Sequence, residues 1–117
     1  VVLMSSLAGK RGAPGLTCYS SSKAAVIGLA TTMAIELAKD GVRVNAVCPG
    51  WIDTPFNNPV IDFIGGREKQ EALIKSFIPL GRQATSEEVA PLFVFLASDE
   101  SSYITAQAIN VCGGVYN

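Results

Sequence analysis

The stretch TCYSSSKAAVIGLATTMAIELAKDGVRVNAVCPG, residues 17–50, decides the fold that the sequence predicts. Apolar side chains recur in its first half at steps of three and four residues. This spacing predicts a helix from about Cys18 to Lys39 with Thr17 as its N-cap. An Asp-Gly pair then stops the helix. Residues 42–48 are rich in β-branched side chains and predict a strand that a Pro-Gly pair ends.

Helices and strands alternate along the whole chain. The predicted elements are a buried strand at 1–5, a glycine-rich loop at 7–17, the helix and strand above, a loop at 51–66, helices at 67–77 and 86–98, and a last strand at 108–111. Strands that alternate with helices form parallel sheets with right-handed crossovers. The sequence therefore predicts an α/β fold.

Two segments of the second half carry further signals. Thr85 and Glu88 form a capping box that opens the helix at 86–98, and Pro91 predicts either a bend or a later start of that helix. Residues 51–66 lack periodicity and predict a long loop of the kind that often serves as a lid. The apolar lid residues either close over a hydrophobic substrate or pack on their own sheet; they are Trp51, Phe56, Val60, Ile61, Phe63, Ile64 and Phe77.

Composition excludes several classes of function. The net charge is −1 with no basic patch, so a nucleic acid is not an expected partner. The most apolar stretch, residues 24–38, is too short and too polar to cross a membrane. Three scattered cysteines and no histidine argue against a disulfide framework, a metal site and Ser-His or Cys-His nucleophiles, and favour a reducing, cytoplasmic setting.

One pair of side chains at the start of the long helix suggests chemistry. Tyr19 and Lys23 are four residues apart and share a helix face. An ammonium near a phenol favours the phenolate, and such a tyrosine can exchange a proton with an alcohol or carbonyl. Ser6, after the first strand, can hold the same oxygen. The Y-x-x-x-K spacing alone is weak, and Ser-Ser or Pro-Gly after a strand is usually a turn. The combination, at the edge where parallel sheets bind ligands, predicts a site.

Three long segments carry a resemblance to a known family. VVLMSSLAG opens the chain, YSSSKAAVIGLATTMAIELAKDGVRVNAVCPGWIDT follows, and PLGRQATSEEVAPLFVFLASDESSYITAQAINVCGG lies near the end. Together they resemble the short-chain dehydrogenase/reductase (SDR) family over nearly the whole chain. The resemblance implies that residues 1–117 are the C-terminal, catalytic and substrate-binding part of one Rossmann-like domain with a doubly wound parallel sheet.

The resemblance also implies a role for each candidate residue. Tyr19 would be the general acid/base, Lys23 would bind the nicotinamide ribose, and Ser6 would orient the substrate oxygen. The cofactor would be NAD or NADP, and besides Tyr19 and Lys23 it would contact Pro49, Gly50, Ile52 and Thr54. The expected activity is hydride transfer between nicotinamide and an alcohol or ketone, in a homodimer or homotetramer with no metal.

Two features depart from the family pattern. The glycine-rich TGxxxGxG phosphate loop is missing, and no glycines are spaced G-x-G. The N-terminal dinucleotide-binding half is therefore expected to be absent from this chain, which alone should neither fold stably nor turn over. Cys112 stands where the family usually has aspartate in VDGG, which puts the anchoring of the last strand in question.

Two other functions remain open at this point. The first is a non-catalytic fragment or pseudo-enzyme that acts only as an assembly partner, and the missing phosphate loop supports it. The second is an extended-type relative of the family, an epimerase or dehydratase of nucleotide sugars; the short lid at 51–66 speaks against it.

Overall fold

The long helix α1 is the largest element of the structure, a computed structural model that describes residues 1–116. It spans Thr17–Leu37, close to the predicted 18–39. The prediction of Thr17 as the N-cap was wrong: Thr17 is the first helical residue, and Leu16 is the cap, because the amide of Ser20 donates to the Leu16 carbonyl at 2.7 Å. Tyr19 therefore lies in the first turn of α1.

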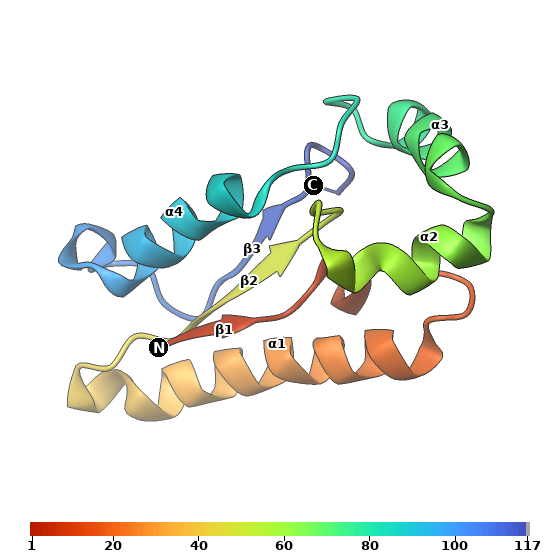
Figure 1. Cartoon of the computed structure of the whole chain (residues 1–117). Helices are drawn as coiled ribbons and strands as arrows, with labels where there is room; N and C mark the ends of the chain where they lie inside the picture. The colour runs from red at the N-terminus through yellow and green to blue at the C-terminus, as the bar shows by residue number, and fades with distance from the viewer. Residues whose placement is uncertain (117) are drawn as a thin grey trace.

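The strands form a three-stranded parallel sheet in the order β1-β2-β3 (Figure 1). Strand β1 is Val2–Met4, β2 is Asn45–Pro49 and β3 is Ala108–Val111. Helix α1 covers one face of this sheet, and α4 lies on the opposite face against β1 and β2. The central strand β2 is buried from Asn45 to Cys48, as expected for a strand covered on both faces. The predicted α/β class and parallel sheet are confirmed.

Strand β2 begins three residues later than predicted. Residues 42–44 have the β-branched composition of a strand, but their backbone amides bond elsewhere. The amide of Val42 donates to the Leu37 carbonyl at 3.2 Å, which closes the turn after α1, and that of Val44 donates to Thr105 Oγ1 at 3.1 Å. Tertiary partners, not local propensity, thus set the start of β2. The predicted last strand at 108–111 is confirmed.

The predicted loop at 51–66 contains a helix, so that prediction was wrong in part. Helix α2 spans Asn58–Ile64, after the short turn η3 at Pro55–Asn57. Pro59 lies at the start of α2, where a helix needs no backbone donor, and Gly65 ends it with φ 103°. Helix α3 follows at Arg67–Phe77, as predicted. The other 3-10 turns are η1 at Leu7–Gly9, η2 at Ala38–Asp40 and η4 at Asp99–Ser101.

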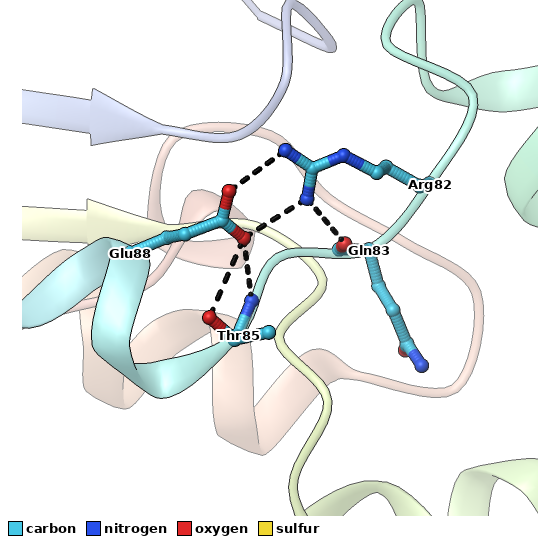
Figure 2. Close-up of polar contacts among 4 residues, drawn as sticks. All are labelled: Arg82, Gln83, Thr85 and Glu88. Atoms are coloured by element: carbon cyan, nitrogen blue, oxygen red, sulfur yellow. Dashed lines mark hydrogen bonds and ion pairs between the residues drawn. The ribbon is translucent and has the colours of Figure 1, made fainter.

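The capping box predicted at Thr85 and Glu88 is present and opens α4, Ser86–Ala97. Pro91 lies inside this helix, so the later start allowed for above does not occur. Glu88 also pairs with the Arg82 guanidinium at 2.7 and 2.9 Å, as Figure 2 shows. This hydrogen-bonded pairing lowers the pKa of Glu88 to about 2 and raises that of Arg82. The ion pair therefore fixes the turn that leads into α4.

Small side chains let α1 approach the sheet closely. Ala30 and Ala34 of α1 are buried against Val44 and Ala46 at the start of β2. Leu3 packs against the same cluster. Among residues 1–116, no helix is both long and apolar enough to span a membrane.

Glu88→Gln should flatten the acid limb of the stability curve. Folding lowers the pKa of Glu88 from 4.5 to about 2, so the pair stabilises the fold above about pH 4.5 and loses this effect as the pH falls through about 2. Urea midpoints of the full-length protein, measured across this range, should fall less in the variant than in the parent. Salt should reduce the difference, because the pair is exposed.

Glu87→Gln is the matched control, since Glu87 lies in the same helical turn but outside the pair with Arg82. It should keep the acid dependence of the parent protein. An equal loss of stability with acid in Glu88→Gln and in the parent would contradict the assignment.

Candidate active site

Two neighbouring elements carry the three predicted catalytic residues. Ser6 follows β1 and caps the turn η1, where its Oγ accepts a hydrogen bond from the Ala8 amide at 3.1 Å. Tyr19 and Lys23 occupy the first two turns of α1. The chain runs from β1 through η1 directly to the start of α1, so all three lie at the carboxyl edge of the sheet (Figure 1).

The structure brings Tyr19 and Lys23 together. The Lys23 Nζ lies 5.8 Å from the centroid of the Tyr19 ring. The same ammonium donates to the Met4 carbonyl at 3.3 Å. Both side chains are half-buried. The Lys23 ammonium is thus close both to the Tyr19 ring and to the end of β1, the strand after which Ser6 follows.

The backbone of α1 at Lys23 contacts the end of β1 directly. Ser5 is only 3% exposed, and its hydroxyl donates to the Lys23 carbonyl at 2.7 Å. A Cβ added to Gly9 would lie 2.7 Å from the Lys23 carbonyl carbon, so only glycine fits there. The sequence analysis missed both residues. The Ser-Ser doublet and the glycine three residues after it were visible, but their partners lie in another element.

The predicted cofactor-contacting residues follow β2 at the same edge. Pro49 ends the strand, and the Gly50 amide donates to the Val111 carbonyl at 2.8 Å. A Cβ at Gly50 would lie 2.9 Å from Cys112, so this close approach also requires glycine. Despite Cys112, β3 pairs with β2 along Ala108–Val111, and the last strand is anchored.

The next two predicted contacts have different roles in the backbone. Ile52 forms an isolated parallel bridge with Ala84, which ties the segment to the turn before α4. Thr54 precedes η3 and is half-buried; its hydroxyl makes no capping bond to this turn. The hydroxyl of Thr54 is thus not used by the local helix.

An aromatic side chain that the sequence analysis did not single out as a site residue covers Tyr19. The ring of Phe56, in η3, lies 6.2 Å from that of Tyr19 at an interplanar angle of 41°. Phe56 is 73% exposed and Phe63 of α2 is 89% exposed, whereas Ile61 is buried. The lid residues therefore divide: Ile61 packs inward, whereas Phe56 and Phe63 are exposed, and of these two Phe56 lies beside Tyr19.

The Cys48 thiol and a nearby cavity do not belong to the site formed by Ser6, Tyr19 and Lys23. Burial raises the pKa of the Cys48 thiol, against the opposing effects of the Lys10 ammonium and the Ser5 hydroxyl, which disfavours a reactive thiolate. A cavity of about 140 Å³ between Trp51 and Arg82 has no contribution from Ser6, Tyr19 or Lys23. Among residues 1–116, no three His, Cys, Asp or Glu side chains gather as a metal site would require.

Comparison with known proteins gives consistent matches along the whole chain. The family described as Enoyl-(Acyl carrier protein) reductase matches residues 1–116. The chain is 49% identical to 3-oxoacyl-(acyl-carrier-protein) reductase FabG of Thermotoga maritima over 98% of its length, and 42% identical to (3R)-3-hydroxyacyl-CoA dehydrogenase of Rattus norvegicus over 99%. It covers 44% and 42% of these relatives.

A solved structure matches in the same way. The crystal structure of 3-oxoacyl-(acyl-carrier protein) reductase from Brucella melitensis superimposes with a TM-score of 0.86 at 37% identity. The match covers 99% of this chain and 41% of that one, so the chain spans less than half the length of the proteins it resembles. The parallel sheet with helices on both faces is a Rossmann-like α/β fold. On these matches, the chain belongs to the short-chain dehydrogenase/reductase family.

Proposed function

We propose that this chain is the catalytic part of an NAD(P)-dependent oxidoreductase that transfers a hydride between nicotinamide and an alcohol or ketone. The observation that carries the proposal is the Lys23 ammonium, 5.8 Å from the Tyr19 ring centroid, at the edge where β1 and β2 end. Residues 1–117 are then the C-terminal part of a single Rossmann-like domain, and the dinucleotide-binding half comes from outside this chain. The coverage of 44% and 41% of two relatives supports this division.

The donors at this edge fit the nicotinamide end of the cofactor. The Lys23 ammonium has three protons, and Met4 accepts one, which leaves donors for ribose hydroxyls. The hydroxyl of Thr54 is not used as a cap, and Pro49, Gly50 and Ile52 supply backbone nearby. When bound, the nicotinamide would accept or supply the hydride.

This placement supports a role for each of the three side chains. In reduction, the Tyr19 hydroxyl gives its proton to the substrate oxygen; in oxidation, the phenolate takes it back. Lys23 stabilises the phenolate through its charge. Ser6 donates a hydrogen bond to the same oxygen and fixes the reacting carbonyl. None of these roles needs a histidine or a metal ion.

We propose an acyl thioester with oxygen at C3 as the substrate. The names of the relatives from Thermotoga maritima and Rattus norvegicus, a 3-oxoacyl-(acyl-carrier-protein) reductase and a (3R)-3-hydroxyacyl-CoA dehydrogenase, support this class. The exposed ring of Phe56 beside Tyr19, with further exposed apolar surface at Phe63 of α2, suits an acyl chain. The alternative, a non-catalytic assembly partner, is favoured only by the missing G-x-G phosphate loop.

We further propose a reducing, cytoplasmic setting and a homodimer or homotetramer. The three cysteines are free, and Cys18 is exposed. Helix α1 exposes the apolar side chains of Leu29 and Ile35, at 52% and 76%, which are suited to burial against further protein.

Tyr19→Phe in the full-length enzyme should lower kcat by about 10²- to 10⁴-fold, because it removes the proton donor. The dissociation constant of NAD(P) should stay close to that of the parent protein. Steady-state rates and cofactor fluorescence titration measure the two quantities. Tyr103→Phe, at a fully exposed position, is the matched control and should be fully active. Undiminished turnover by Tyr19→Phe would exclude the oxidoreductase mechanism.

Lys23→Met should weaken cofactor binding as well as turnover. The substitution keeps an apolar stem but removes the charge and the ribose contacts. Loss of a charge-assisted hydrogen bond predicts an increase in the Kd of NAD(P) of about 10- to 100-fold. Lys39→Met, on the exposed turn after α1, is the control. An unchanged Kd in Lys23→Met would contradict the ribose role.

The 117 residues alone should not unfold cooperatively. Strand β1 is at the edge of the sheet, and the apolar side chains Leu29 and Ile35 of α1 lack cover among the described residues. Calorimetry of the purified chain should show no sharp transition, whereas the full-length protein should show one. A single cooperative transition in the isolated chain would argue against the proposed division of the domain.

A further inference from the structure

We propose that Ser5 and Gly9 are positioning residues that set the separation between Ser6 and the Tyr19–Lys23 pair. The inference rests on the proposed function, because it concerns the geometry of that site. Ser6 lies between these two residues in the sequence, and both of them contact the backbone of α1 at Lys23.

Ser5 joins the sheet to the helix. Its backbone amide donates to the Val47 carbonyl of β2 at 2.8 Å, which continues the pairing of β1 with β2. Its hydroxyl donates to the Lys23 carbonyl at 2.7 Å. Ser5 is only 3% exposed. If its hydroxyl were removed, water could not easily reach the Lys23 carbonyl to replace the lost hydrogen bond. The bond therefore fixes the position of α1 at Lys23 relative to the end of β1.

Gly9, on the other side of Ser6 in the sequence, sets how closely η1 approaches α1. A Cβ there would lie 2.7 Å from the carbonyl carbon of Lys23 and 2.9 Å from the amide nitrogen of Ala24. These are backbone atoms inside a helix and cannot rotate away, so any side chain would push η1 away from α1. Gly9 has no positive φ, so contact and not backbone conformation is the reason for glycine.

A third contact ends at the same helical residue. The Lys23 ammonium donates to the Met4 carbonyl at 3.3 Å, next to Ser5 in β1. Met4, Ser5 and Gly9 thus surround Lys23, and Ser6 lies within this short segment. A shift of η1 relative to α1 moves Ser6 relative to Tyr19 without altering either side chain.

Such a shift should act on the rate and not on affinity. A misplacement of about 1 Å can cost about a hundredfold in rate when the reacting groups must be aligned. Most contacts to the cofactor would lie elsewhere, at residues 49–54 and outside this chain. Weakening the contacts of Ser5 and Gly9 with α1 should therefore lower kcat and leave the cofactor Kd and the number of cofactor-binding sites nearly unchanged.

The test compares Ser5→Ala, Ser5→Thr and Gly9→Ala in the full-length enzyme. We expect Ser5→Ala and Gly9→Ala to lower kcat per bound cofactor by about 10- to 100-fold, with the Kd of NAD(P) within about threefold of the parent. The pH profile of kcat should move as well, because the environment of Tyr19 changes. Ser5→Thr keeps the hydroxyl and should recover most of the rate.

Matched controls lie in the same elements. Ser21→Ala removes a hydroxyl that donates to the Thr17 carbonyl within α1 at 2.7 Å, away from β1. Gly12→Ala adds a Cβ in the same loop as Gly9, where nothing lies within 4 Å. Both controls should keep the parent kcat and pH profile.

Three results would overturn the proposal. One is a kcat within about twofold of the parent in both Ser5→Ala and Gly9→Ala. Another is a loss of rate that merely follows a loss of cofactor-binding sites, which would indicate unfolding. The third is a Ser5→Thr variant as slow as Ser5→Ala. Tyr19→Phe in the same series separates the two hypotheses, since its full activity would refute the proposed function whatever the Ser5 variants do.

Discussion

The direction of α1 relative to the sheet is the constraint on which the rest of the molecule depends. Parallel strands β1 and β2 require a crossover, and α1 supplies it by running back along the sheet (Figure 1). Its first turn must then lie at the edge where β1 ends. Ala30 and Ala34 hold the helix close to β2 along its second half. Because of this geometry, Tyr19 and Ser6 lie at the same edge of the sheet.

The two edges of the sheet are used differently. At the amino edge, Arg43 donates to the carbonyls of Leu96, Ile104 and Ser98, and buried Asn45 also donates to Ile104. These bonds satisfy carbonyls at the C-terminal end of α4 and in the segment after it, and they close that end of the sheet. At the carboxyl edge, hydroxyl and ammonium groups remain half-buried. The hydrogen bonds of Arg43 and Asn45 and the candidate chemistry are thus separated by the length of a strand.

Much of the fold could be predicted from the sequence, and the misses share one cause. Helix α3, strand β3 and the capping box at Thr85 follow from local periodicity and local side-chain bonds. The start of β2 depends on Thr105, which lies far along the chain. Helix α2 has little periodicity, so the sequence predicts a loop there, although Pro59 is compatible with the start of a helix. Likewise, the Tyr19–Lys23 spacing was visible, whereas the contacts of Ser5, Gly9 and Phe56 needed the tertiary structure.

The contacts at Lys23 involve its main chain as well as its side chain. Ser5 bonds to its carbonyl oxygen, and Gly9 approaches its carbonyl carbon; any amino acid that fits the interior of a helix offers this carbonyl in the same place. These two backbone contacts are therefore independent of the side chain at 23, whereas the hydrogen bond to Met4 and the chemistry depend on it. An engineer could exchange the cation for a neutral or unnatural group and keep both backbone contacts, but would lose the hydrogen bond to Met4. At position 23 the reactive side chain can thus be changed while the backbone contacts that hold this residue are kept.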